Sequence, residues 1–138
     1  ILFSIETPKE PCYIKGDLLI DDLFLNLFSN ALKFNKKPKK NVTVSVNKNS
    51  EGYNVFIDDE GIGIPDSRKD TLFEHGDTPS TELGLIIVKR LVDKYRGRIS
   101  VMNRIPEDYT KGTRFAVFFP YPGKERVQVL DFSRLKST

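Results

Sequence analysis

Two asparagines and a lysine share one side of an apolar segment, NLFSNALKF, which runs from Asn26 to Phe34. At helical pitch Asn26 and Asn30 lie one turn apart and Lys33 follows three residues later, so two amides and an ammonium form one stripe. An amide oxygen is a hard ligand that suits magnesium, and a lysine supplies a point charge for phosphate. The stripe therefore suits a magnesium–phosphate ligand, although the solvated face of an ordinary amphipathic helix has the same pattern.

A second polar segment follows a strand-like run, Tyr53–Ile57. Asp58 and Asp59 come directly after this run and lead into Gly61 and Gly63 of the sequence DDEGIGIP. Glycines let a backbone approach a ligand closely, and a carboxylate beside them can accept a hydrogen bond from an exocyclic amine. Such a motif is weak by itself. Because it follows the Asn helix and an intervening hairpin, the two segments together predict an ATP site.

The order of these motifs resembles the GHKL ATP-binding fold and, within it, the catalytic domain of sensor histidine kinases. The resemblance covers about residues 17–120. NLFSNALKF resembles the Asn box of the family and DDEGIGI its first glycine box. Thr71–Glu74 resembles the Phe box, Leu83–Lys89 the second glycine box with the helix that it opens, and Gly112–Phe115 the closing strand.

The resemblance implies a role for each matching residue. Asn30 would coordinate the magnesium that bridges the phosphates, and Lys33 would reach a phosphate. Asp59 would accept the adenine amine, Thr113 would support that contact through its hydroxyl, and Phe34 would flank the nucleotide. The other residues that would line the nucleotide are Gly61, Gly63, Ile64, Gly84 and Leu85. ATP and Mg²⁺ are thus the expected ligands.

Asn26 distinguishes between the activities of the family. In members that hydrolyse ATP this position is typically a glutamate that activates water, whereas an amide has no useful proton affinity. We therefore expect phosphoryl transfer to a protein histidine, with Asn26 in the catalytic group beside Asn30 and Lys33. A hydrolase or an anti-sigma serine kinase is disfavoured, and a degenerate module that binds nucleotide or a partner without kinase activity is the alternative.

The second glycine box departs from the family pattern Gly-x-Gly-Leu-Gly-Leu, because this chain has Ser80-Thr81-Glu82-Leu83-Gly84-Leu85. Only Gly84 remains of the three glycines. Glu82 would place a negative charge beside the triphosphate, which predicts weak binding unless its side chain points outward. The lid between Glu74 and Leu83 is short and rich in Gly, Pro and small polar residues, which predicts a loop without a helix.

The single histidine, His75, is expected to be a solvated loop residue, because acceptor histidines of the family lie on a separate helical hairpin. Cys12 is expected to be a small buried residue, and a single cysteine excludes an internal disulfide. A formal charge of +3 is too small to indicate nucleic-acid binding. The lysines after the Asn helix are expected to form a solvated turn, with a partner patch as the alternative; they are Lys36, Lys37, Lys39 and Lys40.

Hydrophobic periodicity and the order of the elements predict an α+β fold, a two-layer α/β sandwich with a mixed sheet of about five strands and three helices on one face. The family resemblance implies that this sandwich is of the Bergerat type. The expected strands are Leu2–Thr7 at an edge, Cys12–Ile14, Asn41–Asn47, Tyr53–Ile57, Ile99–Met102 and Thr113–Phe119. The expected helices run from an N-cap at Asp17 to Phe34 or Asn35, from Pro65 to Phe73, and from Leu83 to Tyr95, where Gly97 would end the last.

Residues 1–120 are expected to form one catalytic domain and residues 121–138 a C-terminal tail, in which Val127–Leu130 could add a strand. The absence of an initiator Met suggests a fragment of a longer protein. The expected partners are a histidine-bearing dimerisation domain of the same protein and, through the full-length kinase, a response regulator. We expect the isolated fragment to be a monomer and the parent protein to be a homodimer. The expected location is cytoplasmic, with any membrane anchor in other segments of the parent protein.

Overall fold

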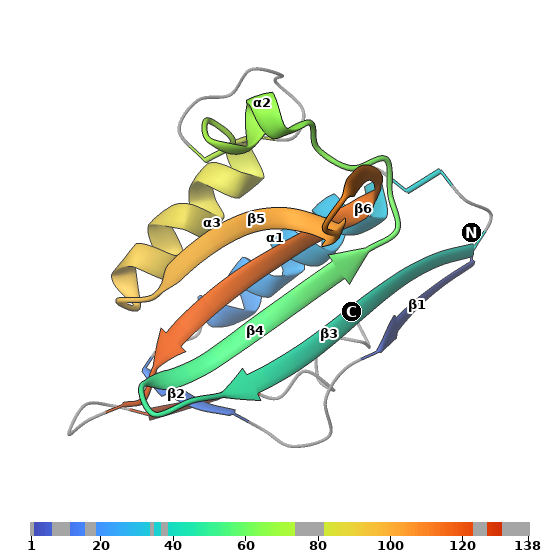
Figure 1. The fold of residues 1–138 in the computed structure, drawn as a ribbon. Coiled ribbons are helices and arrows are strands. Elements are labelled where there is room, and N and C mark those ends of the chain that lie inside the picture. The colour runs from blue at the N-terminus through green and yellow to red at the C-terminus, as the bar shows by residue number, and fades with distance from the viewer. Residues whose placement is uncertain are drawn as a thin grey trace.

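A mixed five-stranded sheet and two helices that cover one of its faces make up the two layers of the fold (Figure 1). The computed structural model describes residues 2–6, 12–15, 19–33, 35–36, 39–73, 82–122 and 127–130. In chain order the elements are β1 (Leu2–Glu6), β2 (Cys12–Lys15), α1 (Ile20–Lys33), β3 (Lys39–Lys48), β4 (Gly52–Asp59), α2 (Asp66–Lys69), α3 (Glu82–Lys94), β5 (Arg98–Ile105), β6 (Asp108–Pro120) and β7 (Val127–Leu130).

The strand order of the main sheet is β1-β3-β4-β6-β5. β1 pairs in parallel with β3, and every other neighbouring pair is antiparallel. The predictions of a mixed sheet of about five strands and of an edge strand at the N-terminus are confirmed. Since β4 lies at the centre of the sheet, the aspartates at its end are held by strands on both sides.

Helix α1 packs its apolar stripe against the sheet and against α3, which joins the two layers into one core. The stripe consists of Ile20, Leu23, Phe24, Leu27, Phe28 and Ala31, all buried. Phe24 is fully buried and lies 5.9 Å, centroid to centroid, from the ring of Phe119 on β6. This packing fixes the rotation of α1 and turns Asn26, Asn30 and Lys33 away from the sheet, as the helical spacing predicted.

The turn after α3 differs from the prediction. Arg96, not Gly97, adopts the left-handed backbone conformation that ends the helix, with a φ of 59°. The Gly97 N–H donates to the Val92 carbonyl (2.9 Å) and closes the turn. A β-carbon on Gly97 would lie 2.2 Å from the Phe118 carbonyl oxygen, so this glycine is required by the close approach of β6.

Helix α2 is shorter than predicted. It begins at Asp66, after Pro65, and ends at Lys69, and turns lead from there to Phe73. Asp70 and Thr71 compete for backbone hydrogen bonds and are poor helix formers. The ring of Phe73 packs edge-on against Phe115 with 6.2 Å between centroids, so contact with the core determines the path of this segment.

Strands β5 and β6 are longer than predicted and form a hairpin whose tip is Pro106–Glu107. The added residues, 103–105 and 108–112, show little apolar alternation, and their strand conformation comes from pairing between the two strands. The hairpin extends beyond the predicted sheet toward the glycine loop after β4 (Figure 1). It therefore adds to the site a part that the sequence did not predict.

Strands β2 and β7 pair with each other in a separate antiparallel ribbon, from Cys12–Leu130 to Lys15–Val127. Strands at Cys12–Ile14 and Val127–Leu130 were both predicted, but their pairing was not. The ribbon brings a strand of the C-terminal tail against one near the N-terminus. The division into a catalytic domain and a tail stays a prediction, and the proposed N-cap, Asp17, lies outside the described residues.

Candidate nucleotide site

Asp59 ends β4 and lies in the interior, with only 5% of its surface exposed. Its Oδ1 accepts a hydrogen bond from the Gly61 N–H (2.9 Å), and its carboxyl also accepts one from the backbone N–H of Thr113 on β6. Burial raises the pKa of Asp59 to about 6, and the two N–H donors and the charge of Arg104 limit that rise. The residue predicted to recognise adenine is thus a buried carboxyl that titrates just below neutral pH.

Thr113 supports the Asp59 carboxyl through its backbone, a contact that the sequence did not predict. The contact that the structure shows is made by the backbone N–H of Thr113. This residue is only 4% exposed and lies beside the end of β4. A role for its hydroxyl toward the nucleotide stays a prediction.

Asp58 points to the opposite face of the sheet, because successive strand residues alternate. There the guanidinium of Arg114 donates two hydrogen bonds to the carboxylate, from Nε to Oδ1 (2.7 Å) and from the terminal nitrogen to Oδ2 (2.8 Å). The Arg114 guanidinium also lies 4.7 Å from the centroid of the Phe56 ring. Of the two adjacent carboxylates, Asp58 is thus neutralised by an ion pair, and only Asp59 lies in the interior on the helix side.

The glycine loop after Asp59 packs against the β5–β6 hairpin. Gly63 has a φ of +79°, and a β-carbon there would lie 1.8 Å from the Tyr109 carbonyl oxygen. Gly112 has a φ of +116°, and a β-carbon there would lie 2.0 Å from the carbonyl oxygen of Asp59. Both glycines allow an approach of two backbones that no side chain would permit. The contact of Tyr109 with the glycine loop was thus not predicted from the sequence.

Ile64 connects the loop to α2 and packs partly buried against the core. Its carbonyl accepts a hydrogen bond from the Lys69 ammonium (2.6 Å), which also pairs with Asp66 (2.6 Å). The same ammonium lies 5.9 Å from the centroid of the Tyr109 ring. The loop is therefore fixed to both α2 and the hairpin.

Asn26 and Asn30 are partly buried on α1, and Lys33 at its last turn is exposed. The amide of Asn26 donates from Nδ2 to the Asp22 carbonyl (2.8 Å), which fixes the orientation of the side chain. Its Oδ1 lies 3.3 Å from the position that a β-carbon on Gly84 would occupy. The first turn of α3 therefore meets α1 at the asparagine stripe.

Gly84 and Leu85 both lie in that first turn of α3. Leu85 is 2% exposed and belongs to the core, so it fixes the helix in place. Gly84 is the residue that leaves room beside Asn26. A helix N-terminus carries free N–H groups and partial positive charge, which favour an anion.

Several predicted site residues fall outside the described part of the chain. They are Phe34, the lid residues 74–81 with His75, and the side chain of Glu82. Their roles stay predictions. Within the described residues there is no group of three or more His, Cys, Asp or Glu side chains that could hold a metal ion.

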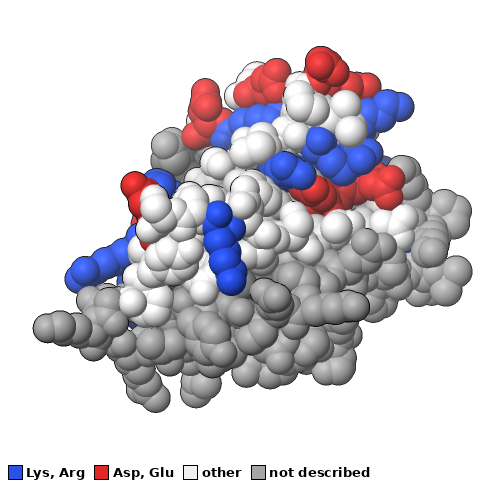
Figure 2. Space-filling view, turned by 60° about the horizontal axis from the view of Figure 1, so that its bottom comes forward, with Lys and Arg blue, Asp and Glu red and all other residues white. Residues whose placement is uncertain are grey.

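Charges of both signs lie next to one another on the face that Figure 2 shows. The described ion pairs include Arg114–Asp58, Lys69–Asp66 and Lys89–Asp93. No helix in the described ranges is long and apolar enough to cross a membrane.

A family model described as histidine kinase-, DNA gyrase B-, and HSP90-like ATPase matches residues 17–123. The sensor histidine kinase AruS of Pseudomonas aeruginosa is 36% identical over 107 residues, which are 69% of this chain and 11% of the relative. The autoinducer 2 sensor kinase/phosphatase LuxQ of Vibrio vulnificus is 32% identical, over 79% of this chain and 14% of the relative. The chain thus spans a small part of the curated relatives that it matches.

Solved structures agree with these relatives. The mycobacterial sensor histidine kinase MprB is 29% identical with a TM-score of 0.73, over 88% of this chain and 83% of that one. The catalytic domain of histidine kinase ThkA is 25% identical with a TM-score of 0.72, over 88% and 81%. The chain therefore belongs to the histidine kinase-, DNA gyrase B- and HSP90-like ATPase family, and within it is an ATP-binding catalytic domain of the sensor histidine kinase type.

Proposed function

We propose that this domain binds magnesium-ATP through Asp59 and the asparagine stripe of α1, and donates the γ-phosphate to a histidine on a separate dimerisation domain of the same protein. The observation that carries the proposal is the position of Asp59. Its carboxyl is buried and is held by the N–H groups of Gly61 and Thr113. A carboxylate fixed in this way can accept a hydrogen bond from the exocyclic amine of adenine. It has no proton of its own with which to donate one.

At the phosphate end, Asn30 would supply an amide oxygen to magnesium and Lys33 a positive charge to a phosphate oxygen. The start of α3 lies beside the stripe through the Gly84–Asn26 contact. Besides magnesium and the Lys33 ammonium, the N–H groups at the start of this helix are a third source of positive potential for the triphosphate. Magnesium, when bound, would neutralise phosphate charge and align the γ-phosphate for in-line transfer.

Asn26 supports transfer over hydrolysis. Its amide hydrogens are directed to the Asp22 carbonyl on one side and its Oδ1 to Gly84 on the other. An amide in this place orients groups but does not remove a proton from water. The acceptor histidine has to come from outside the described residues, and a homodimeric parent that presents it and then passes the phosphate to a response regulator follows from the same proposal.

The experiment is to mix the purified chain with the histidine-bearing dimerisation domain of its own protein and γ-labelled ATP. We expect label on the added domain in the presence of magnesium, and little label or free phosphate from the chain alone. The matched variants are Asn30→Ala, which removes the amide ligand, and Ser29→Ala, whose exposed side chain is next to it on α1. Full transfer by Asn30→Ala, or none by the parent chain when calorimetry shows bound ATP, would overturn the proposal.

A further inference from the structure

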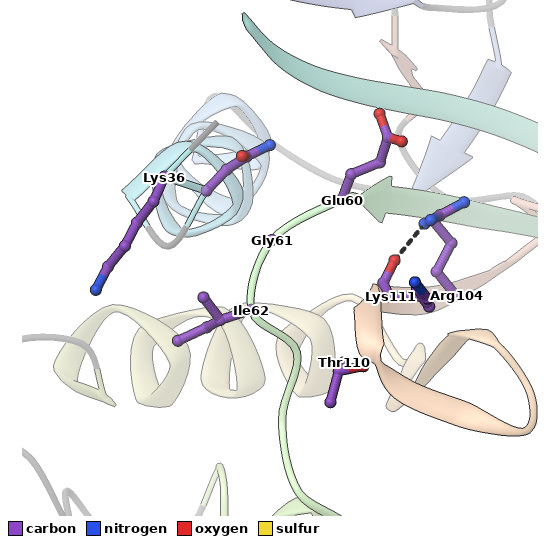
Figure 3. A pocket seen from close by; sticks show the side chains of 8 residues that line it. Lys36, Glu60, Gly61, Ile62, Arg104, Thr110 and Lys111 are labelled. Atoms are coloured by element: carbon purple, nitrogen blue, oxygen red, sulfur yellow. Dashed lines mark hydrogen bonds between the residues drawn. The ribbon is translucent and has the colours of Figure 1, made fainter. Parts of the chain in front are cut away.

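A pocket lies beside the glycine loop that follows Asp59. It has a volume of about 390 Å³ and lies between the end of α1, the glycine loop and the β5–β6 hairpin. Figure 3 shows Lys36 and Ile62 on one side of the loop backbone, and Arg104, Thr110 and Lys111 on the other. None of Asn26, Asn30, Lys33 and Asp59 lines it, and of the residues predicted to contact the nucleotide it shares only Gly61.

The lining is rich in positive charge, with three basic side chains, Lys36, Arg104 and Lys111, and one carboxylate, Glu60. Arg104 donates from Nε to the Lys111 carbonyl (2.8 Å), which fixes the guanidinium at the pocket. The Lys36 and Lys111 side chains are exposed, and no hydrogen bond or ion pair joins either ammonium to another residue within the described ranges. Glu60 accepts a hydrogen bond from the Asn41 amide (3.1 Å), so part of its charge is already stabilised.

An apolar side chain lies beside these charges. Ile62 is 53% exposed, the largest exposure among the large hydrophobic residues of the described chain. Ile62 lies on the same side of the glycine loop as Lys36 (Figure 3), so the pocket has an aliphatic surface as well as basic groups. A single small anion would use the charges but leave Ile62 in water, whereas a peptide with carboxylate and aliphatic side chains would use both.

We propose that this pocket is a docking site for an acidic segment of a protein partner, with carboxylates at Lys36, Arg104 and Lys111 and an aliphatic side chain on Ile62. Charge complementarity across such a contact favours association and selects an acidic partner over a neutral one. Because Gly61 also lines the pocket, the amides of the glycine loop report on occupation directly.

The test is a titration of the nucleotide-free chain with a terminally blocked Glu-Leu-Glu peptide, followed by amide resonances in two-dimensional NMR. We expect saturable shifts at Gly61, Ile62 and Lys111, and none with the matched Gln-Leu-Gln peptide. The double variant Lys36→Gln/Lys111→Gln should bind roughly three- to ten-fold more weakly, as expected for two exposed charge pairs. The control Lys48→Gln/Arg90→Gln removes the same charge from exposed sites outside the pocket and should bind as the parent does.

Three results would overturn the proposal. The first is equal binding of the acidic and the amide peptide, and the second is equal weakening in the two double variants, which would indicate only the general charge of the domain. The third is saturation of the same resonances by inorganic phosphate at the same concentration, which would make the pocket a small-anion site. Since the titration contains no nucleotide, its result does not depend on whether the proposed kinase activity is correct.

Discussion

The amide oxygen of Asn26 on α1 lies 3.3 Å from the place where a β-carbon on Gly84 of α3 would be. Of the three glycines in the family pattern, Gly84 is the one that this chain keeps. The contact explains why, because this glycine lets the start of α3 lie against the asparagine stripe. The spacing between α1 and α3 at this point would set the distance between the amide stripe and the N–H groups that face the triphosphate.

We expect Gly84→Ala to separate stability from nucleotide binding. Alanine is about 1 kcal/mol more favourable than glycine within a helix, but its methyl group requires Asn26 to move by a few tenths of an ångström. Folding stability should therefore change by less than about 1 kcal/mol, while ATP affinity falls. Gly84→Val should lower both, and Arg90→Val, at an exposed position of the same helix, controls for helix propensity. Unfolding in urea and calorimetry measure the two effects, and parent-like ATP affinity in Gly84→Val would contradict the role of this contact.

The ionisation of Asp59 should cost stability. Its pKa in the folded chain is about 6, above the ordinary 3.8, so the folded state holds its proton more tightly and stability falls as pH rises between these values. Asp59→Asn removes that loss and should stabilise the nucleotide-free chain at pH 7 by up to about 3 kcal/mol. The gain should disappear near pH 4. Thermal unfolding at both pH values measures this, and a variant less stable than the parent at pH 7 would contradict it.

Asp58→Asn is the matched control, because the neighbouring carboxylate has the opposite environment. It pairs with Arg114 at 2.7 Å on the other face of the sheet. Its neutralisation removes an attraction, so the variant should lose on the order of 1 kcal/mol of stability at pH 7. Two adjacent substitutions of the same kind are thus expected to act in opposite directions.

ATP affinity should depend on pH through Asp59. The carboxylate form accepts the adenine amine, and about half of the free chain carries a proton there at pH 6. Binding of ATP would favour the ionised form, so the dissociation constant should rise by up to ten-fold for each unit of pH below about 6. Calorimetric titrations between pH 5 and pH 8 with Asp59→Asn as the control would measure this. The same slope in parent and variant would assign it to the phosphates and not to Asp59.

Gly63→Ala should unfold the glycine loop or the whole domain. Its φ of +79° is unfavourable for alanine, and the new methyl group would lie 1.8 Å from the Tyr109 carbonyl oxygen. We expect a loss of at least about 2 kcal/mol. The midpoint of urea unfolding measures the effect, and Gly84→Ala is the glycine control in which the neighbouring atom is a movable side chain. An unchanged midpoint would show that the hairpin does not hold the loop.

The layers of the fold and most site positions could be predicted from the sequence because they depend on local patterns. The spacing of Asn26, Asn30 and Lys33 follows from helical pitch, and the burial of their apolar neighbours fixes the direction in which they point. The position of Asp59 follows from strand alternation, since Ile57 and Asp59 share one face of β4.

Contacts between distant segments could not be predicted. The support of Asp59 by the Thr113 N–H and the approach of Tyr109 to Gly63 depend on the register of β6 and on the path of its hairpin. The residues of this hairpin show no alternation of apolar and polar side chains that would indicate a strand. Likewise, the left-handed backbone conformation at the end of α3 was expected at Gly97, because glycine favours this conformation. In the structure Gly97 allows the close approach of the Phe118 backbone, and Arg96 adopts the left-handed conformation.

The central claim, that Asp59 recognises the adenine amine, is tested most directly by calorimetric titration of the chain with magnesium-ATP and magnesium-GTP at pH 7.5. Guanine carries a carbonyl where adenine carries its amine, so Asp59 should repel it. We predict that the parent and Asp58→Asn prefer ATP and that Asp59→Asn loses roughly 10- to 150-fold in ATP affinity, the range for a hydrogen bond to a charged group. Equal affinity for ATP and GTP in the parent, or parent-like ATP binding by Asp59→Asn, would contradict the claim.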